Sequence, residues 1–405
     1  MKPSRDVQKK GALIADQEAM LVKHIRAAGG LSRIELSHAL TLSPTTIGAY
    51  VDRLLHEGIL IEGERAATGV GRPRTSIALN PVAGQFIGVD FYADEILAVA
   101  MDFAQNVVAQ TRHPIRRTDT AHDVVNAIVR AIEEVLPAKL LRLLGIGIGS
   151  PGPVDRSKGT AREYRYIKGF QNVPLVSPIA ERFDVPVYIE NTANAMALAE
   201  LWFGQGRSLN SFACLSVRSG IGAGIVVNRQ LYSGLSDGAG EIGFWRCPVY
   251  RATSHGSLRP IQKSGPRELE EIASVRAIHD SLAHAIAAGR RSALGDRSRS
   301  LNAEHIVDAY LAHDRLTRSV INAAAGSLGW AIAHLSFCLA PEQVILAGPL
   351  ASLGDDFLNS IAQVSRACFA ATGLPPPSIA MSALGPYSGA LGAAALVVDQ
   401  WKPTR

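Results

Sequence analysis

Long hydrophobic runs, closely spaced cysteines and an export signal are all missing from this chain of 405 residues. No stretch approaches the roughly 18 apolar residues of a membrane helix. The basic N-terminus carries neither an apolar segment nor a small-residue cleavage site, so we expect a cytoplasmic protein without a membrane partner. The cysteines lie far apart and without a metal-ligand spacing, so we expect buried or free thiols; they are Cys214, Cys247, Cys338 and Cys368.

The composition is that of a soluble globular protein, with 47% hydrophobic and 19% charged residues. A chain of this length exceeds the size at which one hydrophobic core keeps growing, so two or three domains are expected. The net charge is +5, and residues 1–80 hold 11 Lys or Arg against 8 Asp or Glu. A basic N-terminal end fits contact with a polyanion, although an ordinary solvated surface produces the same surplus.

Three short helices are indicated near the N-terminus. Apolar residues recur at helical spacing from Gln17 to Ala28, and two glycines end that run. Ser32 and Glu35 form a capping-box pattern that begins a second helix. Ser43 followed by Pro44 begins a third, since serine is a good N-cap and proline suits the first helical position. Two strands of a wing follow, at 59–62 and 72–79.

This pattern indicates a winged helix-turn-helix over residues 1–80, whose third helix would enter a major groove of double-stranded DNA. Its solvent side would present side chains to bases, and the basic wing would reach phosphates or the minor groove. The alternative is a three-helix module for protein contact, with solvated arginines. The candidate DNA-contacting residues are Thr45, Thr46, Tyr50 and Arg53 on the third helix and Arg72 and Arg74 on the wing.

Beyond residue 80, apolar strands alternate with helices and end in glycine or an acid. This alternation indicates an α/β protein with two lobes and a ligand between them. Expected strands lie at 85–90, 96–102, 144–149, 213–218 and 343–348, with a glycine turn at 219–224. Expected helices lie at 120–135, 193–203, 305–312, 316–339 and 389–400.

The order of motifs in this region resembles the ROK family (repressor, open reading frame, kinase), a branch of the actin-like ATPase and sugar-kinase superfamily. The matching pieces are Ile87–Asp90, Gly145–Asp155, Asn172–Leu175, Glu190 with Asn191, Gly220–Gly224, Gly238–Gly243, Glu270 with Ala273 and Ser274, and Ser388–Ala394. The resemblance implies a two-lobed, ribonuclease H-like fold. Its first lobe would span 81–190, completed by a C-terminal helix at 388–403, and its second lobe would span 191–387.

Three departures from the family pattern bear on function. Family kinases follow the first aspartate with a Gly-Gly-Thr turn that cradles ATP phosphates, whereas Phe91–Glu95 stands here and adds negative charge. Thr192 replaces the aspartate that accepts the sugar proton, and a hydroxyl cannot act as a base near neutral pH. Phe244 replaces a zinc-binding histidine, and 250–266 contains no cysteine. We therefore expect no kinase activity, no cofactor, no metal, and a rearranged loop at 251–266.

The resemblance assigns hydroxyl-binding roles in a sugar pocket to Asn191, Glu241 and Glu270, while two further contacts are replaced, at Thr192 and Phe244. An unusual sugar, another polyol or no ligand remain alternatives. We interpret the chain as a DNA-binding regulator, a repressor of carbohydrate genes that binds a pseudo-palindromic operator as a homodimer or homotetramer. The rival interpretations are a ROK-type sugar kinase with an accessory domain and an unliganded architectural factor.

Overall fold

The N-terminal unit consists of three helices and one small sheet. The computed structural model describes residues 5–66, 74–136, 141–252, 257–261, 265–295 and 301–403. Both expected caps are present, since the Ser32 hydroxyl accepts from the Glu35 amide in a capping box and the Ser43 hydroxyl accepts from the Thr46 amide. The elements are α1 (Arg5–Ala28), α2 (Arg33–Leu40), α3 (Pro44–His56) and the antiparallel pair β1 (Leu60–Ala66) and β2 (Arg74–Leu79).

Helix α1 is longer than the apolar pattern predicts. It begins at Arg5 rather than at Gln17, because no proline interrupts the residues between them and a helix can continue beyond its packed part. Leu21 and Ile25 are fully buried as expected, whereas Met20 is exposed. The expected boundary was therefore the edge of the packed surface and not the end of the helix.

The two lobes repeat one sheet topology. When the five strands of each main sheet are numbered 1 to 5 in chain order, both sheets have the spatial order 3-2-1-4-5. Strands 1, 2 and 3 pair antiparallel, and strands 4 and 5 are added by parallel pairing. The first sheet contains β3 (Gln85–Phe91), β4 (Glu95–Asp102), β5 (Val107–Pro114), β6 (Leu143–Ser150) and β10 (Val187–Asn191). The second contains β11 (Phe212–Val217), β12 (Ile221–Val227), β13 (Gln230–Tyr232), β18 (Gln343–Ala347) and β19 (Ser378–Met381).

Helices cover the two sheets and fill the space between them. One face of the first sheet is covered by α4 (Ala121–Val135) and α5 (Val176–Phe183). Its other face packs against α12 (Ser388–Gln400), which also packs along α6 (Thr192–Phe203), and α6 in turn covers the second sheet. The remaining helices of the second lobe are α7 (Glu270–Ala273), α8 (Val275–Ala287), α9 (Ala303–Leu311), α10 (Arg315–Leu339) and α11 (Asp355–Phe369).

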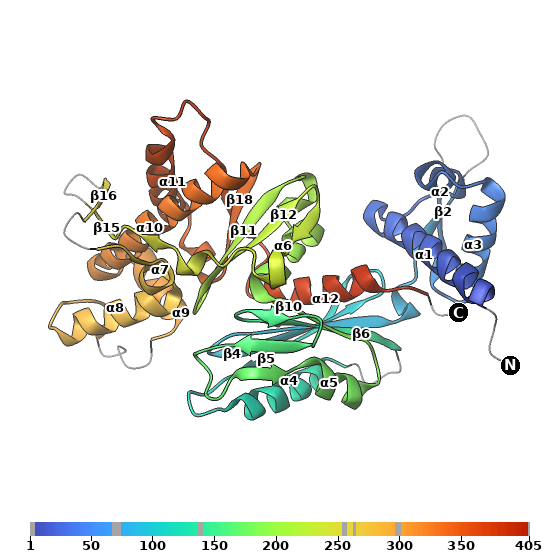
Figure 1. The fold of residues 1–405 in the computed structure, drawn as a ribbon, viewed down its shortest axis with the longest axis horizontal. Coiled ribbons are helices and arrows are strands. Elements are labelled where there is room, and N and C mark those ends of the chain that lie inside the picture. The colour runs from blue at the N-terminus through green and yellow to red at the C-terminus, as the bar shows by residue number, and fades with distance from the viewer. Residues whose placement is uncertain are drawn as a thin grey trace.

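Glycines allow α12 to approach its neighbours at backbone distance. A Cβ atom on Gly88 of β3 or Gly147 of β6 would collide with carbonyl oxygens of α12, and one on Gly392 of α12 would collide with the Ala195 carbonyl of α6. Only residues without a side chain permit such contacts. Helix α12 is thus seated against both lobes with little room to shift, and Figure 1 shows it lying along the first-lobe sheet.

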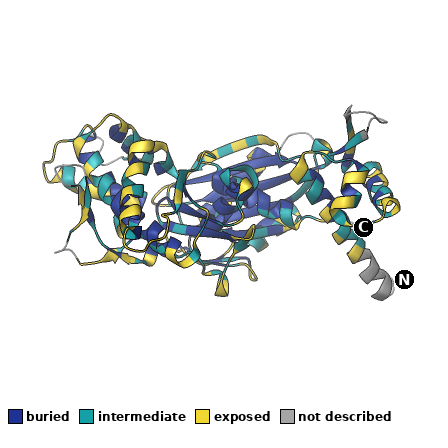
Figure 2. Cartoon of the chain, turned by 90° about the horizontal axis from the view of Figure 1, so that it is seen from above, coloured by how far each residue is buried: buried dark blue, intermediate teal, exposed yellow. Residues whose placement is uncertain are grey.

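The far end of α12 reaches the N-terminal unit. Lys23 of α1 pairs with Asp399 at 2.9 Å, and Lys402 pairs with Asp16 of α1 at 2.6 Å. The Trp401 ring packs edge-on against Phe103, and one hydrophobic cluster joins the core of the N-terminal unit to that of the first lobe. In Figure 2 buried residues run through the middle of the molecule, while exposed residues are concentrated on the helices at its ends.

Smaller elements connect these parts. The short strands are β7 (Val154–Asp155), β8 (Thr160–Glu163) and β9 (Gln171–Pro174) in the first lobe and β14 (Arg246–Cys247), β15 (Tyr250–Ala252), β16 (Leu258–Pro260) and β17 (Arg267–Glu268) in the second. Single 3-10 turns occupy Pro81–Ala83, Gln205–Ser208, Leu235–Asp237, Ile242–Phe244 and Pro349–Leu353.

The structure corrects three expectations for the second lobe. The expected loop at 251–266 contains part of a hairpin, because β15 pairs with β16. The expected glycine turn is shorter than 219–224, because β12 begins at Ile221 and uses the following glycines for pairing. Helix α10 is long and apolar enough to cross a membrane, contrary to expectation, but most of it is buried, as in the core helix of a globular protein.

Candidate nucleic-acid interface and inter-lobe cleft

The first turn of α3 presents two of the predicted DNA-contacting residues. Thr45 is exposed, and Thr46 is half-buried with its hydroxyl 2.8 Å from the Ser43 hydroxyl. The Ser43 cap fixes this turn, and the buried stripe of Ile47, Val51 and Leu54 on the opposite side holds the helix against the unit. A helix N-terminus with small polar side chains on its outer face fits a major groove.

Contrary to expectation, the Tyr50 and Arg53 side chains do not point freely into solvent. The Tyr50 hydroxyl donates to the Gln17 side chain at 2.5 Å, and Arg53 Nε donates to Glu18 at 2.7 Å. Arg53 also pairs with Glu57, and its side chain is only 25% exposed, while Glu18 is fully buried. The apolar pattern did not reveal these acceptors because they lie on α1, more than thirty positions away along the chain.

Of the two predicted wing arginines, one belongs to a described strand. Arg72 lies outside the described residues, and Arg74 is the first residue of β2. The strands β1 and β2 pair over Leu60 to Ala66, so the hairpin expected for a wing is present beside α3.

A buried cluster closes the centre of the cleft between the lobes. Asp90, near the end of β3, is completely buried and accepts a hydrogen bond from the Thr192 hydroxyl at 2.8 Å. Its other oxygen accepts from Arg218, which follows β11 in the second lobe. Burial raises the pKa of the Asp90 carboxyl, while the Arg218 guanidinium and the Thr192 hydroxyl oppose this rise. Thr192 therefore holds a carboxylate in place rather than facing an open pocket.

The remaining contacts of Arg218 complete this cluster. One guanidinium nitrogen donates to the Pro386 carbonyl at 3.3 Å, and the guanidinium carbon lies 4.7 Å from the centre of the Tyr92 ring. Arg218 is 6% exposed, so the ion pair with Asp90 has little contact with water. Arg218 is not among the predicted site residues; its signal in the sequence is an arginine directly before the glycine turn.

Asn191 caps α6 at the edge of the cleft. Its side-chain oxygen accepts from the Ala193 amide, and its side-chain nitrogen donates to the Gly152 carbonyl, both at 2.8 Å. The adjacent Glu190 is fully buried and accepts from Arg156 at 3.1 Å. Arg156 also pairs with Asp237 of the second lobe, so a charged chain crosses the cleft here.

Glu270 receives several donors where it begins α7. The Arg165 guanidinium, the Tyr166 hydroxyl at 3.1 Å and the Ile221 amide at 3.1 Å all donate to it. Burial and the neighbouring Glu270 raise the pKa of the Glu241 carboxyl. The two carboxylates are therefore near enough to interact electrostatically. Arg165 and Tyr166 come from the first lobe and were not anticipated.

Phe244 lies apart from this arrangement. Its side chain is 58% exposed at the end of a 3-10 turn, so it does not form a buried wall. The structure therefore places Asn191 and Thr192 together at the start of α6 and Glu241 near Glu270. It gives Phe244 no comparable position.

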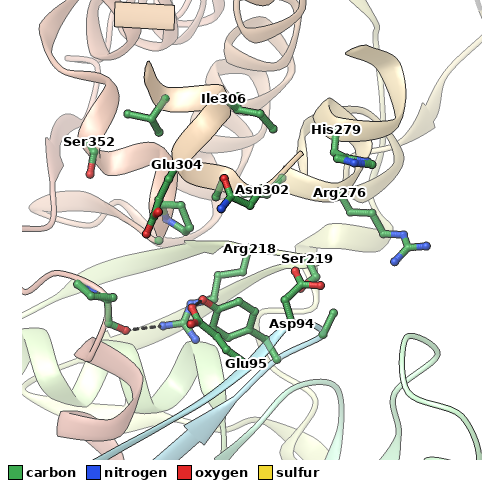
Figure 3. Close-up of a pocket in the computed structure, with 18 of the residues that line it drawn as sticks. Asp94, Glu95, Arg218, Ser219, Arg276, His279, Asn302, Glu304, Ile306 and Ser352 are labelled. Carbon is green, nitrogen blue, oxygen red and sulfur yellow. Dashed lines mark hydrogen bonds between the residues drawn. The ribbon is translucent and has the colours of Figure 1, made fainter. Parts of the chain in front are cut away.

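A cavity of about 830 Å³ lies between the lobes next to the Arg218 cluster, and none of the five predicted ligand-binding residues lines it. Figure 3 shows Asp94 and Glu95 on one side and Asn302, Glu304 and Ile306 on the other, with Arg218 and Ser219 at the base. Its volume is in the range of small-molecule sites. From the sequence, 91–95 is predicted only to bind phosphate poorly, and not to line a cavity.

The charges around this cavity are largely balanced. Arg112 donates to Glu95 and lies 3.6 Å from Glu304, and Arg218 is occupied by Asp90. Burial raises the pKa of Glu95, and Arg112 opposes that rise. A polyphosphate would therefore meet several carboxylates and few guanidinium groups without partners.

Metal-binding side chains do not gather in the part of the chain that the structure describes. Within it, no three His, Cys, Asp or Glu side chains form a group that could hold an ion. Cys214 and Cys247 are buried, Cys338 is exposed, Cys368 is partly buried, and all four are free thiols. Burial raises the pKa of Cys247 to about 11, as expected for a packed thiol.

Similar proteins include both repressors and kinases. A putative xylose repressor of Caldicellulosiruptor sp. (strain Rt8B.4) is 29% identical over 351 residues, covering 85% of this chain and 86% of its own length. The xylose repressor of Bacillus subtilis (strain 168) is 26% identical over 398 residues, covering 96% and 98%. A glucokinase of Halalkalibacterium halodurans is 28% identical, covering 78% and 95%.

Solved structures show the same two groups. A ROK family transcriptional regulator, a homolog of the E. coli MLC protein, matches with a TM-score of 0.76 at 25% identity, covering 96% of both chains. A ROK family glucokinase from Streptomyces griseus, in complex with glucose and AMPPNP, has a TM-score of 0.66 at 26% identity, covering 77% of this chain and 99% of its own. The family model described as "ROK family" matches residues 86–400, and the chain accordingly belongs to that family.

Proposed function

We propose that this protein is a DNA-binding transcriptional regulator, a repressor of genes for carbohydrate transport or metabolism that responds to a sugar or sugar derivative. Residues 1–80 would act as a winged helix-turn-helix, residues 81–190 with the C-terminal helix as the first lobe, and residues 191–387 as the second. Two similar proteins that span almost the whole chain are named as a xylose repressor and a transcriptional regulator, whereas the glucokinase structure leaves part of it unmatched.

The observation that carries the proposal is the buried cluster of Asp90, Thr192 and Arg218. Phosphoryl transfer needs a base at the sugar hydroxyl and a positively charged place for the phosphates. Thr192 supplies no base, and Arg218 is already neutralised by Asp90. A cleft of this kind favours binding over catalysis, so the protein is proposed to have no kinase activity.

The proposed sugar-binding residues are Asn191, Glu241 and Glu270. Amide and carboxylate groups satisfy buried hydroxyls, and the proposal is supported by Asn191, which bonds to the first-lobe Gly152 carbonyl, and by Glu270, which receives the first-lobe Tyr166 hydroxyl. Because Glu270 is held by Arg165 and Tyr166 of the first lobe, a bound sugar would exchange some of these contacts for its own hydroxyls. Xylose is the first compound to test, given the names of the repressor relatives.

On the DNA, Thr45 and Thr46 are proposed to face base edges and the hairpin of β1 and β2 to contact the backbone. Two copies would bind the half-sites of a pseudo-palindromic operator, as symmetric dimers of such units do. A cytoplasmic location follows from this role. Arg53 is assigned a supporting part, because its guanidinium holds Glu18 of α1.

The test begins with selection of duplexes from a random pool by the full-length protein, followed by fluorescence anisotropy with and without xylose, glucose or N-acetylglucosamine. We expect one enriched duplex and a change in its affinity with one sugar. Asn191→Ala should abolish the sugar effect and keep DNA binding, and Thr46→Ala should alter sequence preference.

A coupled assay with ATP and the same sugars tests the kinase alternative. Turnover that disappears in Asn191→Ala, or failure to enrich any duplex, would refute the regulator.

A further inference from the structure

The ion pair between Asp90 and Arg218 joins the two lobes. Asp90 belongs to β3 of the first sheet, and Arg218 follows β11 of the second sheet, 128 positions later. Both side chains are almost completely buried, and the cavity opens beside Arg218. Separating the lobes would break this pair and bring both charges into contact with water or with a ligand.

All three partners of the Arg218 guanidinium lie outside the second-lobe sheet. Asp90 and Tyr92 belong to the β3 strand and the turn after it, and Pro386 lies two residues before α12. The Arg218 side chain of the second lobe therefore contacts the first lobe and the residues just before α12. Figure 3 shows the Arg218 side chain at the base of the cavity, with its hydrogen bond marked.

The same cluster touches both helices that lie between the sheets. Thr192, the first residue of α6, donates to Asp90, and Asn191 caps that helix. At the first turn of α12, a Cβ atom on Gly389 would collide with the Asp90 carboxylate, so helix and carboxylate are in close contact. A movement of Asp90 relative to Arg218 cannot leave the starts of α6 and α12 unaffected.

The opposite end of α12 holds the N-terminal unit. Asp399 pairs with Lys23 of α1, and Lys402, just beyond the helix, pairs with Asp16 of α1. Between its two ends, α12 is packed against β3 and β6 through glycine contacts that leave no space for independent bending. One helix thus connects the cleft to the unit that carries α3.

We propose that the Arg218–Asp90 pair is an inter-lobe latch whose closed or open state is passed along α12 to α1, so that Arg218 couples ligand binding to DNA binding. The latch itself is independent of ligand identity, whereas its effect on DNA rests on the proposed function. Ligand binding at Asn191 would bias the latch through Thr192, since both residues begin α6. Arg218 acts here as a positioning residue and need not touch the ligand.

Hydrogen exchange of the full-length chain tests the latch directly. Arg218→Gln removes the charge and shortens the side chain, and Asp90→Asn with Arg218→Gln removes both charges together. We expect exchange at 91–95, 218–222 and 385–389 to rise by about tenfold or more in both variants, as for a local opening. Arg182→Gln is the matched control, because it breaks an exposed ion pair with Glu133 within the first lobe and should leave these segments unchanged.

Two results would overturn the latch. One is unchanged exchange in these segments in both variants. The other is a uniform rise across the whole chain, or failure of both variants to fold, since either would make the pair a requirement of folding and not a movable contact.

The coupling is measured with the selected duplex and the sugar that changes its affinity. The coupling is the ratio of the duplex affinities measured without and with the sugar. If this ratio in the wild type lies within the usual range of about 5–150-fold, Arg218→Gln should reduce it to below about twofold, while binding of the duplex and of the sugar stays measurable. A wild-type ratio retained in Arg218→Gln would refute the coupling. A wild type that binds no duplex would refute the proposed function, and hydrogen exchange would still decide the latch.

Discussion

Replacing Arg53 by alanine separates a structural from a DNA-contacting role for this residue. Arg53 donates to Glu18 through two nitrogens and to Glu57 through a third. Glu18 is 0% exposed, and truncation of Arg53 removes a guanidinium that pairs with it. Removing one partner of a buried ion pair costs about 3–5 kcal/mol. Because the Arg53 side chain is 25% exposed, we expect Arg53→Ala to lower the free energy of unfolding by about 2–3 kcal/mol, between the values for surface and buried pairs.

The measurement is urea unfolding of the full-length chain followed by circular dichroism, with operator binding measured at low urea. The N-terminal unit should unfold at a lower urea concentration in Arg53→Ala, and DNA binding should be lost in parallel. Arg33→Ala is the control, since its partner Asp52 is exposed and such pairs contribute about 0–1 kcal/mol. Thr45→Ala, at an exposed position, should change stability by less than about 0.5 kcal/mol and weaken operator binding.

One outcome would refute this reasoning. If Arg53→Ala kept wild-type stability yet lost operator affinity with a shallower salt dependence, Arg53 would be a phosphate contact. A double variant, Glu18→Gln with Arg53→Met, gives a second check. It removes both charges, so it should recover part of the lost stability, because replacing a buried pair by uncharged groups is often nearly neutral.

Three further variants test other parts of the structure. Thr192→Asp places a second carboxylate against the buried Asp90; it should cost about 2–4 kcal/mol in urea unfolding and give no phosphoryl transfer, and turnover in a coupled assay would contradict this. Arg26→Met should raise the melting temperature and increase the free energy of unfolding by up to about 1–2 kcal/mol. Burial lowers the pKa of Arg26 to about 10, and two of its nitrogens are buried without a hydrogen-bond partner among the described residues. A lower melting temperature would show that its contact with the Phe103 ring outweighs desolvation. Burial raises the pKa of Glu241, so the folded chain binds this proton more tightly than the unfolded chain, and stability falls as pH rises above the ordinary value of 4.5 through the raised pKa. Glu241→Gln should therefore be more stable than wild type at neutral pH, with the gain vanishing below 4.5; a gain independent of pH would exclude titration as its cause.

Local features of the fold were predictable because their signals are local. Ser32, Ser43 and Thr120 cap the helices that follow them, since a cap needs only a residue type and a spacing of three. The strands around 85–102 were likewise indicated by their apolar character and pair as a hairpin. The extra length of α1 was not predicted, because the residues before Gln17 mix polar and apolar types and include Gly11, which lowers helix propensity.

The site was only partly predictable, because its decisive contacts join distant parts of the chain. The sequence indicated that Thr192 lacks the chemistry of a base, but it could not show that the hydroxyl binds Asp90, 102 positions away. Arg218 and Arg165 escaped notice, since an isolated arginine gives no sign of the carboxylate it will meet. Tyr50 and Arg53 were placed on the correct helix, but their partners on α1 were invisible to helical periodicity.

The position of α12 has a consequence for biosynthesis. This helix follows the strands of both sheets along the chain, yet it covers one face of the first-lobe sheet and pairs with α1 at its far end. During translation the strands of the first lobe therefore leave the ribosome before the helix that covers this face of their sheet. A chain truncated before Ser388 would lack α12 and expose this face of the first-lobe sheet. We expect such truncated products to be degraded by proteases before they can compete for the promoter.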